Sequence, residues 1–382
     1  MFHYLAQYLL AQTEGTELGD LISGLRVFRY IAFRTAGAAM TSLLMSLLLG
    51  PPIIGWLRWM NFGEHYTSKA GEHGVAAAGP FDKRGTPTMG GILLVLVIEV
   101  TVLLWTQLNY LVALALLPLV VLAGLGFFDD YTKVKKQTSD GVRGKVKLVV
   151  QCALALFIGV YLWMIPATQR LVTEIMVPFW KYPVMTGATA TGIALILFTI
   201  VGSSNAVNLT DGLDGLAIGC TLLVAAVFIV LTYVAGNAKI AAYLNVPYVA
   251  GAGELTVVCS AIFGASLGFL WFNCYPAEVF MGDTGSLALG GVLGIVAVLI
   301  HQPFVLFIAG GVFVAEALSV MVQVMGFKLT RRWYGEGRRL LRMAPLHHHF
   351  QKLGWPESKV TTRFYIAGVL CGVAALASLK LR

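Results

Sequence analysis

The chain has 382 residues, of which 58% are hydrophobic and only 12% are charged, with 27 Lys and Arg against 19 Asp and Glu. A soluble globular protein carries about 25% charged residues and cannot bury this much apolar surface in one core. With a mean hydropathy of +0.78, the composition excludes a soluble enzyme, a disordered protein and a disulfide-stapled secreted domain. It predicts an all-α, polytopic integral membrane protein.

Ten apolar runs are long enough to cross a hydrocarbon core, which needs roughly 20 helical residues. None of them has the period-two alternation of an outer-membrane barrel strand. Residues 1–12 are expected to form a short interfacial helix, and Glu14, Glu17 and Asp20 argue against a cleavable signal. The predicted spans are 23–49, 88–107, 110–128, 146–165, 188–205, 214–235, 255–272, 285–301, 304–326 and 362–380.

The charges between the spans indicate an orientation. Most Lys and Arg residues fall in three connections, and the positive-inside rule places these in the cytoplasm and both termini in the periplasm. Arg26, Arg29 and Arg34 oppose this orientation. We expect one transmembrane domain over 1–382, whose active-site face is formed by cytoplasmic loops at about 50–87, 129–145, 205–213, 273–284 and 327–361.

The first polar motif, KRGTPTMGG at 83–91, opens the second predicted span. Lys83 and Arg84 could meet a phosphate at the helix N-terminus, and Thr86 or Thr88 could cap it. The alternative is that the two basic residues only anchor the membrane interface.

The second motif, FFDDYTK at 127–133, ends the third predicted span. Neighbouring helical residues point about 100° apart, so Asp129 and Asp130 are expected to have different roles. Lys133 lies four residues after Asp129, and a plain ion pair between them is the alternative to a functional role.

The third motif, NAVNLTDGLDGL at 205–216, repeats polar residues at a spacing of three: Asn205, Asn208, Asp211 and Asp214. Such a spacing can line one stripe at a helix end, and amides beside carboxylates suit a nucleobase or a sugar. A polar turn between helices is the alternative interpretation.

The fourth motif, FMGDTGS at 280–286, adds Asp283, with Phe280 as an aromatic platform for a base or as ordinary interfacial packing. Asp129, Asp130, Asp211, Asp214 and Asp283 then all lie at helix ends on the predicted cytoplasmic face. A hard divalent cation would relieve their repulsion, and oxygen ligands of this kind suit Mg²⁺. By contrast, Glu99 and Glu316 fall alone inside spans, where hydrogen bonds between helices explain them.

The longest predicted cytoplasmic loop contains a basic stretch at 331–342, which is expected to rest on anionic lipid headgroups, and then APLHHHF at 344–350. Imidazoles near a phosphate could donate hydrogen bonds or move protons, or the histidines could belong to a plain surface loop. Together the motifs predict phosphoryl transfer between a soluble and a lipid reactant. A transporter with a midplane ion site, or a membrane scaffold, does not explain acids gathered at one face.

These motifs, together with WFNCYPAEVFMGDTGS at 271–286 and MAPLHHHF at 343–350, resemble the bacterial phospho-N-acetylmuramoyl-pentapeptide transferases, also called translocase I. This family belongs to the polyprenyl-phosphate N-acetylhexosamine-1-phosphate transferases, and a sugar-only member of that superfamily is the nearest alternative. The resemblance implies ten spans in the bacterial inner membrane and the first membrane step of peptidoglycan synthesis. The implied reaction joins UDP-N-acetylmuramoyl-pentapeptide and undecaprenyl phosphate to give lipid I and UMP. Mg²⁺ dependence, a homodimer and inhibition by nucleoside antibiotics are implied as well.

The resemblance also implies site residues, motif by motif. Asp129, Asp130 and Asp283 would be catalytic and hold Mg²⁺, and His348 would be catalytic. The implied substrate-binding residues are Lys83, Thr88, Lys133, Lys145, Asn205, Asn208, Asp211, Asp214, Asn273, Phe280, His347 and His349. Two mechanisms stay open: direct attack by the lipid phosphate with an aspartate as base, or a covalent phospho-aspartyl intermediate.

Overall fold

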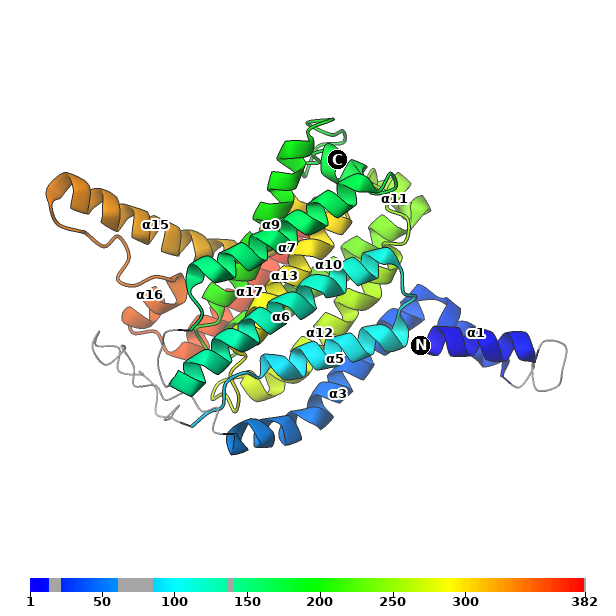
Figure 1. Cartoon of the computed structure of the whole chain (residues 1–382), viewed down its shortest axis with the longest axis horizontal. Coiled ribbons are helices and arrows are strands. Elements are labelled where there is room, and N and C mark those ends of the chain that lie inside the picture. The colour runs from blue at the N-terminus through cyan, green and yellow to red at the C-terminus, as the bar shows by residue number, and fades with distance from the viewer. Residues whose placement is uncertain (14–21, 61–84, 137–140, 381–382) are drawn as a thin grey trace.

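The apolar runs form long α-helices, because a helix satisfies its backbone N–H and C=O groups internally and needs no water. The computed structural model describes residues 1–13, 22–60, 85–136 and 141–380, so Lys83 lies outside the described residues (Figure 1). The elements are α1 (Phe2–Gln12), η1 (Ser23–Arg29), α3 (Ile31–Trp59), α5 (Gly91–Trp105), α6 (Tyr110–Lys136), α7 (Gly144–Met164), α8 (Arg170–Thr173), α9 (Thr189–Thr210), α10 (Leu216–Gly236), α11 (Ala238–Leu244), α12 (Gly253–Asn273), α13 (Gly282–Leu299), α14 (Pro303–Ala309), α15 (Gly311–Tyr334), α16 (Leu346–Lys352) and α17 (Glu357–Ala377).

Within the described residues, nine helices are long and apolar enough to cross a membrane, and α5 is a shorter apolar helix of 15 residues. At 1.5 Å per residue, α5 covers about 22 Å. It begins at Gly91 because the preceding residues pair with another segment: Pro87 O accepts from Phe280 N, and Gly90 N donates to Phe280 O, both at 2.8 Å. The all-α, multi-pass fold is therefore confirmed, with nine full spans and one short helix where ten spans were predicted.

Several predicted spans have different limits in the structure; α6, for example, continues to Lys136, past the predicted end at 128. The span predicted at 23–49 is displaced, because α3 begins only at Ile31 and continues through Pro51 and Pro52 to Trp59. A proline costs the helix one backbone hydrogen bond, but neighbouring turns can carry the helix past it. The span predicted at 304–326 is divided at Gly310 into α14 and α15. Average hydropathy registers neither feature, since both depend on local backbone geometry.

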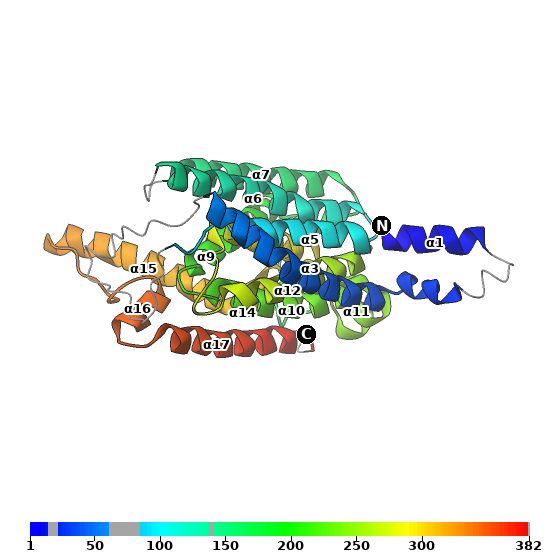
Figure 2. The same cartoon turned by 90° about the horizontal axis from the view of Figure 1, so that it is seen from below.

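The centre of the bundle is formed by α10, α12 and α13, whose surfaces are the most buried. Figure 2 shows α6 and α7 along one side and α17 along the other, with α10 and α12 between them. The α13 helix packs against α6, α9 and α5. Glycines permit its close approach to α6, since a Cβ at Gly126 would overlap the carbonyl of Asp283. This contact brings the C-terminal part of α6 to the start of α13.

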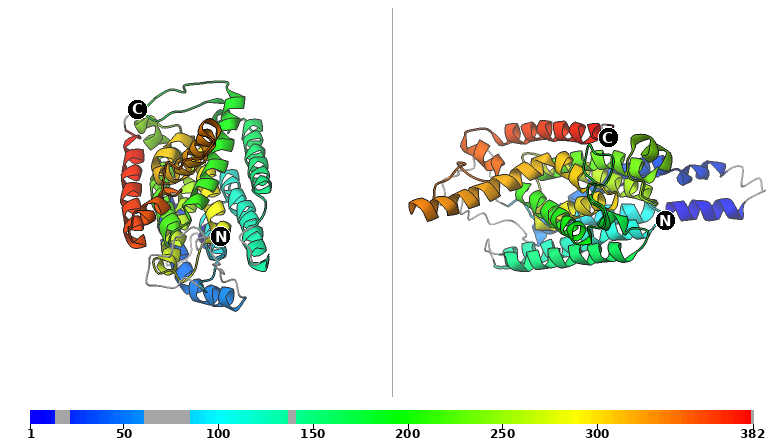
Figure 3. Two further views of the ribbon diagram at one scale, coloured as in Figure 1. Left: turned by 90° about the vertical axis from the view of Figure 1, so that its left-hand side faces the viewer. Right: turned by 90° about the horizontal axis from the view of Figure 1, so that it is seen from above.

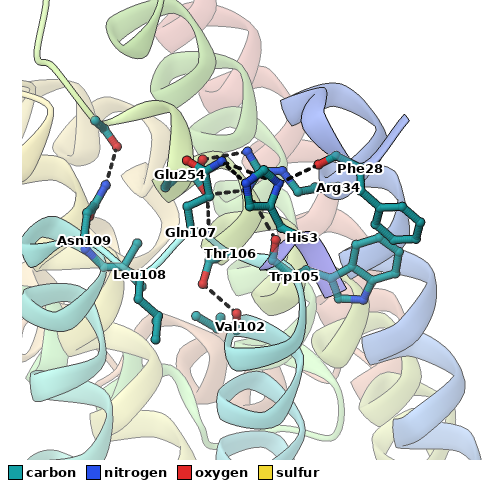
Figure 4. A network of polar contacts seen from close by, with 12 residues as sticks. His3, Phe28, Arg34, Val102, Trp105, Thr106, Gln107, Leu108, Asn109 and Glu254 are labelled. Carbon is teal, nitrogen blue, oxygen red and sulfur yellow. Dashed lines mark hydrogen bonds and ion pairs between the residues drawn. The ribbon is translucent and has the colours of Figure 1, made fainter. Parts of the chain in front are cut away.

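The far end of α6 is fastened by a buried polar network (Figure 4). Arg34 of α3 donates two hydrogen bonds to the carboxylate of Glu254 on α12, at 2.6 and 2.7 Å. Glu254 also accepts from Gln107 N at 2.8 Å, in the connection between α5 and α6. His3 of α1 contacts the Gln107 side chain and lies 3.0 Å from Phe28 O. The network thus joins four elements at one end of the bundle.

Two elements extend away from the packed helices. Figure 3 shows α15, in orange, and α1, in dark blue, at opposite ends of the molecule. The short helix expected over residues 1–12 is present as α1. The outer part of α15 leaves the bundle with exposed apolar side chains, among them Met321, Val324 and Met325.

Candidate metal and phosphate-binding site

Asp129 lies at the centre of a cluster of charges near the end of α6. Its carboxylate is fully buried. Its Oδ1 accepts from Val142 N at 2.7 Å and lies 2.8 Å from Lys147 Nζ. Its Oδ2 lies 2.6 Å from Lys133 Nζ, so the ion pair considered from the sequence is present. It is one contact within a larger cluster.

Asp130 has a different set of partners. Its Oδ2 accepts from the backbone N and the hydroxyl of Thr284, at 2.9 and 2.8 Å, and its Oδ1 accepts from Asp283 N at 3.2 Å. These backbone donors belong to the first turn of α13, whose N-terminus carries a partial positive charge. Asp130 therefore caps α13 from a neighbouring helix and holds Asp283 in place.

Asp283 completes the cluster from the first turn of α13. Its Oδ2 lies 2.6 Å from Lys147 Nζ and 3.4 Å from Lys133 Nζ. One carboxylate oxygen from each of the three aspartates lies within 4.8 Å of the other two. Neighbouring helical residues point about 100° apart, but the carboxylates of Asp129 and Asp130 still both lie beside Asp283.

The cluster has the composition of a metal site. Three carboxylates face two ammonium groups, so one negative charge remains uncompensated among these five side chains. Buried charges need compensation, and hard oxygen donors are the ligands that divalent cations such as Mg²⁺ prefer. The three aspartates could therefore hold a metal ion.

Lys147 is the member of the cluster that sequence reasoning missed. Lys145, which was predicted to bind substrate, is exposed, whereas Lys147 is partly buried between Asp129 and Asp283. The inward position of Lys147 could have been predicted from helical spacing. Lys147 precedes Gln151, Leu154 and Ile158 by 4, 7 and 11 residues, and these three lie on the buried face of α7. Helical spacing therefore turns Lys147 inward.

The NAVNLTDGLDGL segment closes α9 and opens α10. Asn205 donates to Gln151 Oε1 at 2.9 Å, which links it to the inward face of α7. Asn208 and Asp211 are partly buried at the last turn of α9. Asp214 is buried and accepts from Ala277 N at 3.1 Å. The predicted stripe is thus fixed to two neighbouring segments.

The segment between α12 and α13 is pinned on both sides. Asn273 accepts from Gly215 N at 3.2 Å and donates to Val279 O at 2.8 Å. Phe280 is held between Pro87 and Gly90, as described above, and Thr88 is buried beside Gly282. These contacts bring three of the sequence motifs together.

The three histidines of α16 have three different environments. His347 is buried, its backbone N donates to Glu316 Oε1 at 3.1 Å, and its Nδ1 lies 3.1 Å from Glu316 Oε2. His348 Nδ1 lies 2.9 Å from Gln351 Oε1. His349 Nδ1 accepts from Arg342 N at 3.1 Å. Glu316, which seemed isolated in its span, therefore has a histidine partner.

His347 also reaches the NAVNLTDGLDGL segment. A Cβ at Gly212 would overlap Nε2 of the imidazole, so the ring lies directly against that glycine. Eight of the predicted residues therefore fall into two groups. The first combines the three aspartates with Lys133, and the second combines the 211–215 turn with Asn273 and His347.

Comparison with known proteins gives a consistent result. Residues 112–301 match the model of glycosyl transferase family 4, and residues 83–95 match phospho-N-acetylmuramoyl-pentapeptide-transferase signature 1. A phospho-N-acetylmuramoyl-pentapeptide-transferase from Methylacidiphilum infernorum is 48% identical over 94% of this chain and 96% of the relative. Proteins of the same name from Opitutus terrae and Desulfotalea psychrophila are 48% and 46% identical, each over 96% of this chain and 98% of the relative.

Proposed function

The chain belongs to the phospho-N-acetylmuramoyl-pentapeptide-transferase family, and we propose that its transfer reaction takes place at the cluster of Asp129, Asp130 and Asp283. It is a multi-pass bacterial membrane enzyme of peptidoglycan synthesis. It transfers phospho-N-acetylmuramoyl-pentapeptide from UDP-N-acetylmuramoyl-pentapeptide to undecaprenyl phosphate, which gives lipid I and UMP. The observation that carries the proposal is the meeting of three carboxylates and two ammonium groups from α6, α7 and α13.

Mg²⁺ is the proposed ion. Asp283 would be its main ligand, with Asp129 and Asp130 beside it, and the hardness of the oxygen donors supports this choice. When bound, the ion supplies neutralisation of charge on phosphate oxygens. Lys133 and Lys147 lie within 3.4 Å of Asp283 Oδ2 and carry the positive charge that diphosphate oxygens need. We assign them to orienting those oxygens.

Asp129 is proposed as the base in a direct displacement. It takes the proton of undecaprenyl phosphate, whose oxygen then bonds to the β-phosphorus of the nucleotide sugar. The bond from that phosphorus to the bridging oxygen breaks, and UMP leaves with the bonding electrons. Lys133 and Lys147, at 2.6 and 2.8 Å, favour the ionised form of Asp129 that a base requires.

The second group of residues is proposed to hold the nucleotide sugar. We assign Asn205, Asn208, Asp211, Asp214, Asn273 and Phe280 to this role. Hydrogen bonds of Asp214 and Asn273 join the turn after α9 to the segment between α12 and α13, which supports the assignment. The same proposal keeps Thr88, Lys83, Lys145, His347 and His349 as substrate-binding residues and His348 as catalytic. The contact of His347 with Gly212 supports a shared site for the histidines and this turn.

Further expectations belong to the same proposal. The active-site face would lie in the cytoplasm and both termini in the periplasm, because the positive-inside rule assigns the connections richest in Lys and Arg to the cytoplasm. A single domain over 1–382, a homodimer and binding of nucleoside antibiotics follow from the family. None of these enters the chemistry proposed above.

UMP release by the purified protein tests the function. Undecaprenyl phosphate and Mg²⁺ are supplied with either UDP-N-acetylmuramoyl-pentapeptide or UDP-N-acetylglucosamine, each with an EDTA control. We expect EDTA-sensitive release with the muramoyl-pentapeptide alone. Release with the plain sugar nucleotide alone would contradict the proposal. A phospho-aspartyl enzyme trapped during turnover would overturn direct attack and leave the transfer itself intact.

A further inference from the structure

A buried amide lies between the aspartate cluster and the end of α9. Gln151 follows Lys147 by one helical turn on the inward face of α7, and its side chain is buried. Its Nε2 donates to Ser204 Oγ at 3.1 Å, and its Oε1 accepts from Asn205 Nδ2 at 2.9 Å. One face of α7 therefore supplies Lys147 to the aspartates and Gln151 to the last turns of α9.

The hydrogen bonds of Gln151 have a fixed direction. Ser204 Oγ donates to Leu287 O of α13 at 3.0 Å, and a carbonyl oxygen can only accept. The single hydroxyl proton of Ser204 is thereby used, so its oxygen accepts from Gln151 Nε2. Gln151 Oε1 is then turned toward Asn205 as an acceptor. The backbone of α13 thus determines which way the Gln151 amide faces.

The same direction is passed on to Asn205. Its Nδ2 donates to Gln151 Oε1 at 2.9 Å and to Val201 O at 2.8 Å, so both N–H groups of the amide are used. Its Oδ1 accepts no hydrogen bond within the described part of the chain. Because Asn205 is only half-buried, this oxygen can accept a hydrogen bond from a ligand.

We propose that Gln151 is a positioning residue, which holds the amide oxygen of Asn205 toward the nucleotide sugar. The group that Asn205 meets is then a donor, a hydroxyl or an N–H of that substrate, because an ionised phosphate oxygen can only accept. Phosphate oxygens are left to Lys133 and Lys147. The inference rests on the proposed function, which assigns Asn205 to the nucleotide sugar.

Steady-state kinetics of UMP release test the positioning role. Gln151→Met keeps about the same size but removes the acceptor, so the Asn205 amide is free to turn. We expect the KM for UDP-N-acetylmuramoyl-pentapeptide to rise about tenfold, which is the scale of one neutral hydrogen bond. The kcat and the KM for undecaprenyl phosphate should stay close to those of the wild type. Gln151→Glu should restore the KM, since a carboxyl in either protonation state offers Asn205 an acceptor.

Two neighbouring serines provide a matched pair of variants. Ser204→Ala removes the hydroxyl that sets the direction of the Gln151 amide, and it should raise the KM for the nucleotide sugar about threefold. Ser203→Ala is the same change one position earlier, where the hydroxyl donates to Ile200 O of its own helix at 3.2 Å. It should leave that KM unchanged.

A second pair of variants tests the donor on the substrate. Asn205→Asp keeps an oxygen acceptor and adds a negative charge, whereas Asn205→Leu keeps the shape and has no acceptor. If the substrate presents a donor, Asn205→Asp should bind UDP-N-acetylmuramoyl-pentapeptide more tightly than Asn205→Leu, as measured by titration calorimetry with Mg²⁺. An equal or reversed order would overturn the assignment of a donor.

Several outcomes would contradict the positioning role of Gln151. These are an unchanged KM in Gln151→Met, equal changes in the two serine variants, a loss confined to kcat, and an equal rise in KM for both substrates. If Gln151→Met does not fold, the comparison of Ser204→Ala with Ser203→Ala still decides. Failure of the wild-type chain to release UMP would contradict the proposed function instead, so the two failures are distinguishable.

Discussion

Each of the three clustered aspartates has its own partners, so each substitution should have its own consequence. The Asp130 carboxylate accepts hydrogen bonds from the first turn of α13, and Asp129 is enclosed by two lysines and a backbone donor. Asp283 is the most accessible of the three and has Lys147 as its nearest partner. It is therefore the position where charge can be removed with the least damage to the fold.

Asp283→Asn is expected to lower turnover at least about 100-fold, because it removes the main proposed ligand of the ion while an amide keeps the shape. The midpoint of thermal unfolding in detergent should stay close to that of the wild type. UMP release across a Mg²⁺ titration, with unfolding followed in parallel, measures both. Wild-type activity at ordinary Mg²⁺ would remove Asp283 from the metal role.

Glu316 is expected to act as a positioning residue through His347. Its carboxylate contacts both the backbone N and Nδ1 of His347, whose Nε2 faces the Gly212 turn. Glu316→Gln keeps one acceptor but loses the charge that orients the ring, so kcat should fall about 10- to 100-fold. Adding His347→Ala should cause little further loss, because the two residues act as a unit.

The control for this prediction is Glu99→Gln. Glu99 is also a carboxyl inside an apolar helix, but it lies on the partly exposed face of α5 and should leave kcat unchanged. Fully additive losses from Glu316→Gln and His347→Ala would show that the two side chains act independently.

The site residues differ in how far the sequence could predict them. Asp129, Asp130, Asp283 and Lys133 meet as the motifs suggest. Lys147 was missed because sequence motifs mark residue types, whereas its inward direction follows from the phase of α7. The pairing of Glu316 with His347 joins positions 31 residues apart, and no local pattern encodes that contact.

At the scale of helices, hydropathy predicted which segments are helical but not where a helix is interrupted or begins. The apolar runs of α10, α12 and α13 match the predicted spans within a few residues, because burial or lipid contact requires most positions to be apolar. The division at Gly310 is a change in local backbone geometry, and the start of α5 at Gly91 follows from hydrogen bonds with the segment 280–281. Neither feature changes the average hydropathy of its segment.

The network at the far end of α6 should be a purely structural element. Glu254→Leu leaves Arg34 buried without its partner and should lower the free energy of unfolding by about 3–5 kcal/mol. The pair of substitutions Arg34→Met and Glu254→Leu should recover most of that loss, since it removes both charges together. Thermal unfolding of the two variants in detergent measures the difference.

Activity gives the second measurement for this network. Gln107 and Asp129 are separated by most of α6, about 30 Å along the helix, so folded Glu254→Leu protein should retain its specific activity. If specific activity falls as far as stability, the network is coupled to the transfer site.

At the scale of the whole molecule, the proposed ion would tie together helices that are far apart in the chain. Asp129 and Asp130 come from α6 and Asp283 from α13, and α13 is at the centre of the bundle. An ion bound there stabilises the folded chain without contacting the unfolded one. Lys133 and Lys147 already compensate two of the three charges, so the gain depends on the one that remains.

Mg²⁺ is therefore expected to raise the midpoint of thermal unfolding of the substrate-free enzyme, and EDTA should reverse the rise. At a concentration 100 times the dissociation constant, the stabilisation is about 2.7 kcal/mol. Asp283→Asn should lose this response, and an equal response in that variant would place the ion elsewhere. If activity needs Mg²⁺ but the free enzyme shows no rise, the two lysines hold the cluster closed until the nucleotide diphosphate arrives with its ion.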